Sequence, residues 1–370
     1  MIHKEISDKQ FQMDSLDGLR GFAALIVVFS HTSNQGAFFL PLLDLSGVGK
    51  SGVYLFFLLS SFLLTLPLLR KGKEIFTFPV MSHYWQRRFF RIYPLYTLYL
   101  LLGVVSTWFL VTFIGKSGRG IPFELTWFEF LKHLALLEGK GVTWSIAVEF
   151  KFYFILPILI LVIVYIRQLG TAATVSLFTF LMIASQIISP QSESLTNDAR
   201  LLPYMPVFII GIFIAVLHEH INKNKPNHKV MMTLKWLGFI GVIGVIIMTP
   251  VIYSKITGVS VPKNFFHKQF IAYSIFWSFI ILSAVNIDGI IQKLFSIKIL
   301  RFYGTLSFSL YLFHPVYISL LMRLNLNSYL AAWLVLVSST ITAYLTFVIL
   351  EKPISRYKLK FKSDPSQVKL

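Results

Sequence analysis

The stretch "DSLDGLRGFAALIVVFSH", residues 14–31, begins with charged residues, continues as an apolar run and ends in a histidine. Arg20 and His31 are eleven positions apart, which in an α-helix is close to three whole turns and roughly 16 Å. Their side chains would therefore share one helical face, and further charged residues, among them Asp17, lie at the start of the same helix. Ionisable groups inside a membrane are costly, so the pair predicts a functional site. The alternative is a set of polar residues hydrogen-bonded between helices.

The composition around this stretch is that of an integral membrane protein. Hydrophobic residues make up 55% of the 370 and charged residues 14%, and the mean hydropathy is +0.70. We expect an all-α integral membrane protein, a bundle of about ten transmembrane helices with short loops. The predicted spans are 18–34, 51–69, 89–114, 142–165, 171–189, 203–217, 232–253, 267–285, 302–322 and 328–350.

The net charge of +18 comes mainly from short loops between apolar runs. With the N-terminus placed inside, 23 of the 34 Lys and Arg fall in inside segments and 10 in outside segments. This bias predicts that both termini are cytoplasmic and argues against nucleic-acid binding. Residues 1–15 are too polar for a cleavable signal peptide, and 354–370 is expected to be a basic cytoplasmic tail.

The absence of cysteine excludes disulfides, cysteine-ligated metals and an acyl-cysteine intermediate. No zinc-ligand spacing and no GxSxG motif is present, so we expect no metal. His218, His220 and His228 lie in a basic segment and are expected to be solvated.

Three arginines, Arg87, Arg88 and Arg91, occur where the third span begins. Arg88 and Arg91 are neighbours at i, i+3 on a helix, a spacing that suits a forked grip on phosphate. Together with Arg20 they favour an anion site over simple positive-inside anchoring, which needs charge alone.

The fourth span opens with Trp144 and Ser145, and Ser145, Glu149 and Tyr153 follow i, i+4, i+8 on one face. A carboxylate inside a bundle needs a partner or a function. Glu149 is therefore expected to pair with a basic group, to orient a histidine or to contact a sugar hydroxyl.

In the ninth span Ser307, Tyr311 and His314 form a polar stripe at i, i+4 and i+7. Such a stripe either lines a cavity or forms a hydrogen-bond seam between helices. Ser60 and Ser61, in the second span, are expected to serve in packing.

The motifs taken in order resemble membrane-bound acyltransferase family 3, whose members O-acylate carbohydrates and related acceptors. They are "LDGLRGFAALIVVFSH" (16–31), "GVYLFFLLSSFLL" (52–64), "RRFFRIYPLY" (87–96), "WSIAVEFKFY" (144–153), "SFSLYLFHP" (307–315) and "EKP" (351–353). The resemblance covers most of the chain, with 1–353 as the acyltransferase domain.

The resemblance implies an acyl-CoA donor, most often acetyl-CoA, that approaches from the cytosol in the inner membrane of a bacterium. It implies His31 as catalytic base, with Arg20, Arg88 and Arg91 on the donor side. Glu149 is a candidate to assist His31. Supporting or substrate-binding roles fall to Asp17, Trp144, Ser145, Ser307, Tyr311 and His314. The expected partners are the lipid bilayer and a carbohydrate or glycolipid acceptor.

Two positions depart from the family pattern, Tyr54 where an acid is frequent and Ser61 where glycine is frequent. Many relatives carry an appended extracellular hydrolase-like domain, which we do not expect here because the sequence ends soon after the last predicted span. The partner of His31, Glu149 or His314, stays open, as does the choice between direct transfer and an acyl-histidine intermediate. A transporter or flippase of a glycolipid or small anion is the alternative function.

Overall fold

The computed structural model describes residues 2–115, 120–195, 197–224 and 226–355, with side chains from Asp14 onward, and within these ranges it is helical without strands. The predicted tail from residue 356 lies outside the described residues. The helices are α1 (Ile2–Asn34), α2 (Gly49–Lys71), α3 (Phe78–Ile114), α4 (Trp127–Leu134), α5 (Thr143–Ile166), α6 (Thr171–Ile188), α7 (Met205–Lys223), α8 (His228–Ile247), α9 (Pro250–Thr257), α10 (Phe270–Asn286), α11 (Ile290–Phe295), α12 (Lys298–Leu321), α13 (Ser328–Thr346) and α14 (Lys352–Ser355). A π-helical turn, Phe347–Glu351, joins the last two.

Eight of the described helices are long and apolar enough to cross a membrane: α2, α3, α5, α6, α7, α8, α12 and α13. They coincide with eight of the ten predicted runs, so the chain is a multi-pass membrane protein. The other two predicted runs correspond to the second half of α1 and to α10, which has 17 residues. The total of ten spans and the cytoplasmic termini stay predictions.

The predicted span 232–253 is wrong as a single helix. In the structure α8 ends at Ile247 and α9 begins at Pro250. Proline has no N–H to continue a helix, and it forces the preceding residue, Thr249, into an extended conformation. The chain therefore turns before the predicted end of this run.

The centre of the bundle is the contact between α1 and α12, the most extensive between any two described helices. A Cβ on Gly304 would lie 2.0 Å from the carbonyl oxygen of Asp17, and one on Gly21 would lie 1.9 Å from that of Leu300. Only glycine permits this approach, as is usual where membrane helices pack closely. Because His31 and His314 also meet, the two helices run in the same direction.

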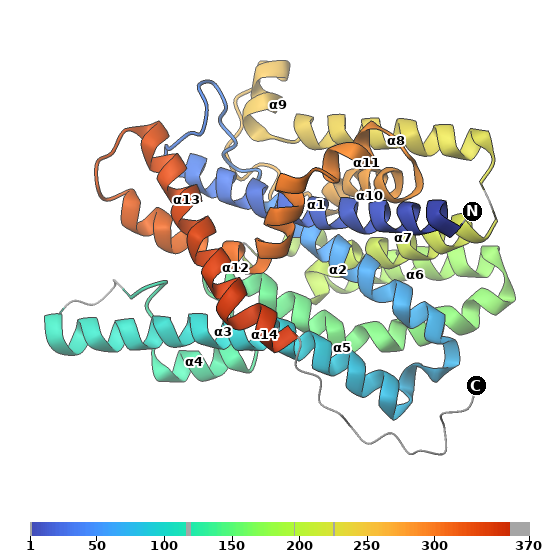
Figure 1. Cartoon of the computed structure of the whole chain (residues 1–370), viewed down its shortest axis with the longest axis horizontal. Coiled ribbons are helices and arrows are strands. Elements are labelled where there is room, and N and C mark those ends of the chain that lie inside the picture. Colours follow the sequence, from blue (N-terminus) through green and yellow to red (C-terminus); the bar gives the residue numbers. More distant parts are fainter. Residues whose placement is uncertain (1, 116–119, 196, 225, 356–370) are drawn as a thin grey trace.

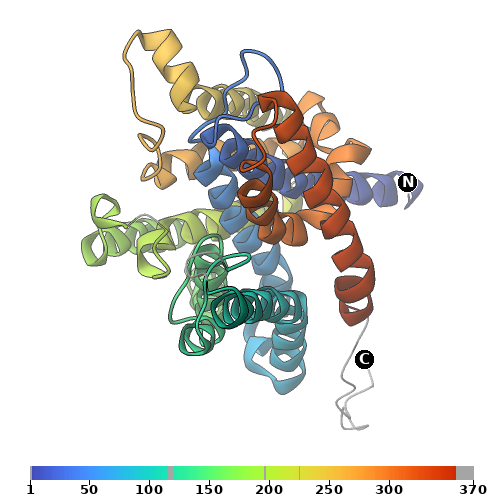
Figure 2. The same ribbon diagram turned by 90° about the vertical axis from the view of Figure 1, so that its left-hand side faces the viewer.

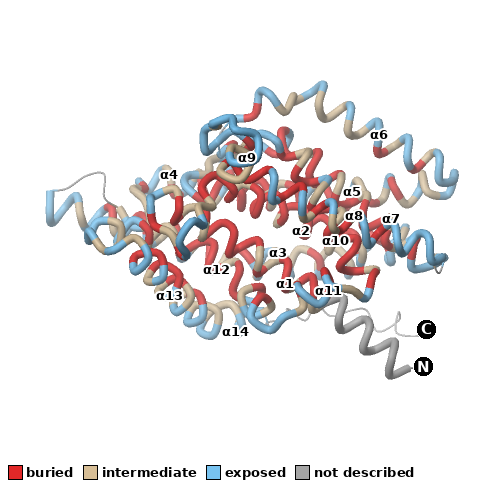
Figure 3. Tube along the Cα trace, turned by 90° about the horizontal axis from the view of Figure 1, so that it is seen from above, coloured by how far each residue is buried: buried red, intermediate tan, exposed pale blue. Residues whose placement is uncertain are grey.

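Other helices lie at the periphery of the bundle. Figure 1 shows α4 beside α3 at one edge of the molecule, and Figure 2 shows the same pair together at the periphery. In Figure 3 buried segments gather where α1, α2, α10 and α12 meet, whereas α6 lies outside this core and is mostly exposed. The most protected positions are therefore along α1 and its neighbours.

The two departures from the family pattern have structural explanations. Ser61 packs against Gly211 of α7, where an added Cβ would lie 1.8 Å from the serine Oγ. The Ser61 hydroxyl donates to the carbonyls of Phe57 and Leu58 at 3.0 Å, which confirms the prediction that it serves in packing. Tyr54 is buried, and its hydroxyl donates to the carbonyl oxygen of His267.

One histidine prediction is wrong. His218 is 8% exposed rather than solvated, because α7 continues past it and its ring lies against α10. Its Nδ1 lies 2.9 Å from Oδ1 of Asn286, and its Nε2 lies 3.0 Å from Nδ2 of Asn222. His220 and His228 are exposed as predicted.

Candidate active site

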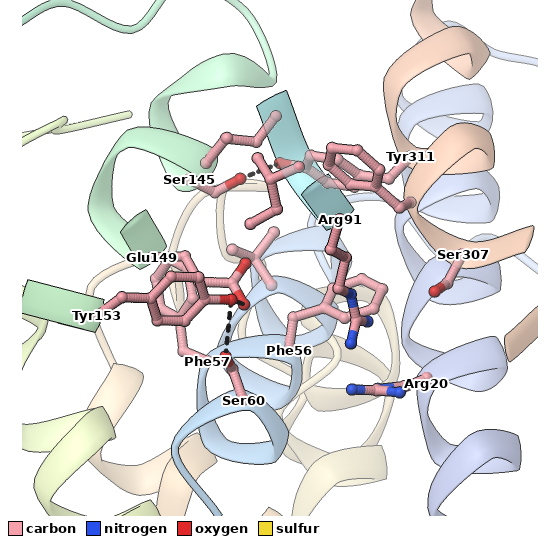
Figure 4. A pocket seen from close by; sticks show the side chains of 14 residues that line it. Arg20, Phe56, Phe57, Ser60, Arg91, Ser145, Glu149, Tyr153, Ser307 and Tyr311 are labelled. Atoms are coloured by element: carbon pink, nitrogen blue, oxygen red, sulfur yellow. Dashed lines mark hydrogen bonds between the residues drawn. The ribbon is translucent and has the colours of Figure 1, made fainter. Parts of the chain in front are cut away.

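Five helices converge on a cavity in the middle of the bundle (Figure 4). Its empty space, including the mouth, is about 620 Å³. Its polar lining comes from Arg20 of α1, Ser60 of α2, Arg91 of α3, Ser145, Glu149 and Tyr153 of α5, and Ser307 and Tyr311 of α12. The shared face predicted for α5 thus lines the cavity together with Ser307 and Tyr311 of the α12 stripe, whereas His314 of that stripe does not line it.

One end of this cavity is charged, and we call Arg20 and Arg91 the arginine end. Figure 4 shows the two guanidinium groups side by side, reaching in from α1 and α3. Asp17 lies 3.7 Å from Arg20 one turn earlier on α1, and its side chain is 46% exposed. Two guanidiniums facing one space form a natural site for an anion such as phosphate.

The predicted pair of Arg88 and Arg91 is divided between two environments. Arg91 lines the cavity, whereas the guanidinium of Arg88 lies 5.9 Å from the ring centroid of Tyr153. The Nε of Arg88 is buried without a partner among the described residues. Arg87 is exposed on the same helix.

Glu149 belongs to the arginine end and not to the histidines. Its Oε1 accepts a hydrogen bond from the hydroxyl of Tyr153 at 2.5 Å, and the same hydroxyl lies 3.3 Å from Oγ of Ser60 (Figure 4). The α5 face thus places a carboxylate in the cavity that holds two arginines, where it lowers the net positive charge.

At the other end of the cavity Tyr311 bridges α12 and α5. Its hydroxyl lies 2.8 Å from Oγ of Ser145 and donates to the carbonyl of Val142 at 3.1 Å. The Tyr311 ring is 6.0 Å from the ring of His314, one turn further along α12. The cavity therefore ends next to the histidines, although neither His31 nor His314 lines it.

His31 and His314 form a direct pair, which we call the histidine end. Nδ1 of His31 lies 2.8 Å from Nε2 of His314, and the ring centroids are 5.0 Å apart. His31 is half-buried and His314 is fully buried. Of the two partners predicted for His31, His314 is the one in contact with it.

The sequence did not single out two basic residues near the histidine end, Lys50 and His267. Lys50 lies in the first turn of α2, and its Nζ lies 3.8 Å from the ring centroid of Trp144 and donates to Oδ1 of Asn197 at 2.9 Å. Trp144 is therefore buried beneath Lys50 and does not line the cavity. His267, in the loop before α10, has its pKa lowered to about 4 by burial and by Lys50. The signal for Lys50 was its position as the single basic residue between the first two predicted spans.

The comparison with protein families decides the class of this chain. A family model described as an acyltransferase domain (Acyl_transf_3) matches residues 13–352. The chain belongs to acyltransferase family 3. The resemblance of the six motifs is thereby confirmed, because the match begins just before the first motif and ends within the last.

Three curated proteins are similar in sequence to this chain. A Staphylococcus aureus (strain MSSA476) protein provisionally named O-acetyltransferase SAS0844 is 26% identical over 95% of this chain and 59% of its own length. O-acetyltransferase OatA of Staphylococcus aureus (strain NCTC 8325 / PS 47) is 24% identical over 94% of this chain and 58% of its own. Acyltransferase MdmB of Streptomyces mycarofaciens is 32% identical over 40% of this chain and 39% of its own length. The chain thus spans less than two thirds of these curated relatives. No solved structure matches it.

The family motifs map onto one connected region of this acyltransferase domain. The first and fifth motifs supply the histidine pair, and the third and fourth supply Arg91 and Glu149. The closing "EKP" motif lies at the π-helical turn, where Glu351 accepts a hydrogen bond from Ser309 of α12. Among the described residues no group of three His, Asp or Glu could hold a metal ion.

Proposed function

We propose that this chain is a membrane O-acyltransferase of the bacterial inner membrane. It moves an acyl group, in the first instance acetyl, from cytosolic acyl-CoA to a hydroxyl of an extracytoplasmic carbohydrate or glycolipid. The observation that carries the proposal is one cavity with two arginines at one end and a histidine pair next to the other.

The arginine end fits the phosphates of a CoA nucleotide. Arg20 and Arg91 lie together in the cavity, and eleven residues of α1, roughly 16 Å, separate Arg20 from His31. The pantetheine arm of CoA spans a comparable length. A donor held by the arginines would thus carry its thioester toward Tyr311 and the histidines.

The histidine end fits the chemistry of acyl transfer. A neutral imidazole takes a proton from an attacking hydroxyl, which is general base catalysis. In the proposed step the acceptor oxygen bonds to the thioester carbonyl carbon and His31 takes the hydroxyl proton. The carbon–sulfur bond then breaks, and the CoA thiolate recovers the proton from His31. The product is an ester and free CoA, with no net change in protonation.

The contacts of Glu149 modify the role predicted for it. Its carboxylate is hydrogen-bonded to Tyr153 in the arginine cavity, so we propose that it tunes donor binding through charge. Ser145 and Tyr311 are proposed to close the cavity beside the histidines, and Ser307 to line the donor path.

The test uses His31→Ala with the exposed His220→Ala as matched control. Cell-surface glycans are examined by mass spectrometry in cells that express equal amounts of each protein. We expect ester-linked acyl groups to disappear with His31→Ala and to persist with His220→Ala. Persistence with His31→Ala would refute the role of His31, and a wild-type protein that neither binds nor consumes acetyl-CoA would favour a transporter.

A further inference from the structure

We infer that His314 is a positioning residue that holds His31 in the tautomer with its proton on Nδ1, so that Nε2 is the nitrogen that takes the hydroxyl proton. The inference rests on the proposed function of His31 as base. It specifies which nitrogen of His31 accepts the proton, since the two ring nitrogens of a neutral histidine are not equivalent.

The backbone of α12 determines which nitrogen of His314 carries the proton. Nδ1 of His314 lies 3.2 Å from the carbonyl oxygen of Leu310. A carbonyl oxygen only accepts hydrogen bonds, so the proton of this contact belongs to Nδ1 of His314. A neutral imidazole carries one N–H, and Nε2 of His314 is therefore an acceptor.

The protonation of His314 determines that of His31 on α1. Nδ1 of His31 lies 2.8 Å from Nε2 of His314. With an acceptor on the His314 side, the proton must lie on Nδ1 of His31, which leaves the lone pair on Nε2. If the proton were instead on Nε2 of His314, the lone pair of its Nδ1 would face the Leu310 carbonyl inside a fully buried site. The carbonyl contact would then lack a hydrogen, at the cost of an unsatisfied hydrogen bond.

A charged His314 is disfavoured in the same place. The ring is fully buried, and the groups described around the pair are Tyr311 of the same helix, Lys50 at the start of α2 and His267 of the loop before α10. None of these is a carboxylate, so nothing there would stabilise a second positive charge. His314 stays neutral and acts as a fixed acceptor.

The local sequence explains why α12 can hold the ring in this way. Pro315 follows His314 and has no N–H, so the carbonyl of Tyr311 loses its partner four residues later in the helix. The turn before the proline thus contains a carbonyl without a helical partner, one residue after the Leu310 carbonyl that Nδ1 contacts, so this second acceptor also favours a proton on Nδ1 of His314. The close contact at Gly304 and Gly21 sets α1 beside α12, which brings His31 to the far side of the His314 ring.

The inference also fixes the state of the pair after proton transfer. Once Nε2 of His31 has taken the hydroxyl proton, Nδ1–H still donates to His314, and no second proton needs to move. The ring keeps its orientation while it returns the proton to the thiolate. His314 thus acts through His31 and need not touch the substrate.

The experiment measures the tautomer directly. Full-length protein labelled with ¹⁵N-histidine is purified in detergent, and the ring nitrogens are recorded by long-range ¹H–¹⁵N NMR at a pH where His31 is neutral. The His31 signals are assigned by their absence in His31→Ala. We expect the proton on Nδ1 in the wild type and in His314→Gln, whose side-chain oxygen can accept, and a loss of this preference in His314→Leu.

Kinetics with acetyl-CoA supply the second readout. We expect kcat to fall by about 100-fold in His314→Leu and to recover to within about tenfold of wild type in His314→Gln, with the donor KM unchanged in both. An Nε2–H tautomer in the wild type, or a His314→Leu protein with wild-type kcat, would overturn the inference. Activity in His31→Ala would instead overturn the proposed function, so the two failures are distinguishable.

Discussion

The two ends of the α1 segment between Arg20 and His31 differ in charge and in the way their polar groups are satisfied. At the arginine end Arg20 and Arg91 face an open cavity, with Asp17 and Glu149 nearby. At the histidine end two imidazoles hydrogen-bond to each other and to the backbone. One end presents two guanidinium groups to an open cavity, which suits anion binding, and the other holds a neutral base in one orientation, which suits chemistry.

The glycine contact between α1 and α12 supports both ends, so breaking it should have the largest effect. We expect Gly304→Val to abolish activity and to lower stability by about 3 kcal/mol or more, because its Cβ would collide with the Asp17 backbone. Thermal unfolding in detergent measures the loss. Thr305→Val, at an exposed position of the same helix, is the control, and equal stability of the two variants would contradict the packing account.

Arg91→Ala should impair only the arginine end. We expect the donor KM to rise by about 10- to 100-fold, the value of a charge-assisted contact of roughly 1.5–3 kcal/mol, with kcat little changed. Arg87→Ala removes an exposed arginine of the same helix and should leave KM unaltered. Equal effects of the two variants would indicate that the arginines serve only as membrane anchors.

Glu149→Gln distinguishes the two ends, because the carboxylate was one of two candidate partners of His31 and lies in the cavity with Arg20 and Arg91. Removal of its negative charge should lower the donor KM about threefold and leave the acid limb of the pH–rate profile in place. Steady-state kinetics at several pH values provide the measurement. A shift of that limb would assign Glu149 to His31 after all.

Replacement of His267 tests whether the histidine end is neutral, and its expected effect, on the pH dependence of stability, is the smallest of the four. Its pKa in the folded protein is about 4, below the unfolded value near 6.5. The unfolded chain therefore binds more protons between these values, and stability falls as the pH drops from about 6.5 to about 4. We expect His267→Gln to reduce this fall by about 1 kcal/mol, since the ring is half-buried. Unfolding temperatures at pH 7.5 and 5 measure it, with the exposed His228→Gln as control, and an unchanged fall would contradict the assignment.

The sequence was informative where one helix determines the answer. Hydrophobic run length located the membrane-spanning helices, and helical periodicity placed Ser145, Glu149 and Tyr153 on one cavity-lining face. The same periodicity placed Ser307 and Tyr311 in that cavity. These patterns depend only on the geometry of a single helix.

The sequence was uninformative where two helices must be placed relative to each other. The partner of His31 depends on how α1 crosses α12, which the glycines at 21 and 304 determine by contact and not by local pattern. Burial of His218 depends likewise on α10, and the separation of Arg88 from Arg91 depends on where α5 presents Tyr153. Pro250 was the exception, since the local rule for proline indicates a helix break there, but the span 232–253 was drawn from hydrophobicity alone.

The central claim is that binding and chemistry lie at opposite ends of one segment of α1. The most direct measurement is the affinity of purified His31→Ala for acetyl-CoA, by calorimetric titration in detergent beside wild type and Arg91→Ala. We predict that His31→Ala binds acetyl-CoA with wild-type affinity and does not transfer the acyl group, while Arg91→Ala binds about 10- to 100-fold more weakly. Loss of binding in His31→Ala with full binding in Arg91→Ala would contradict the account.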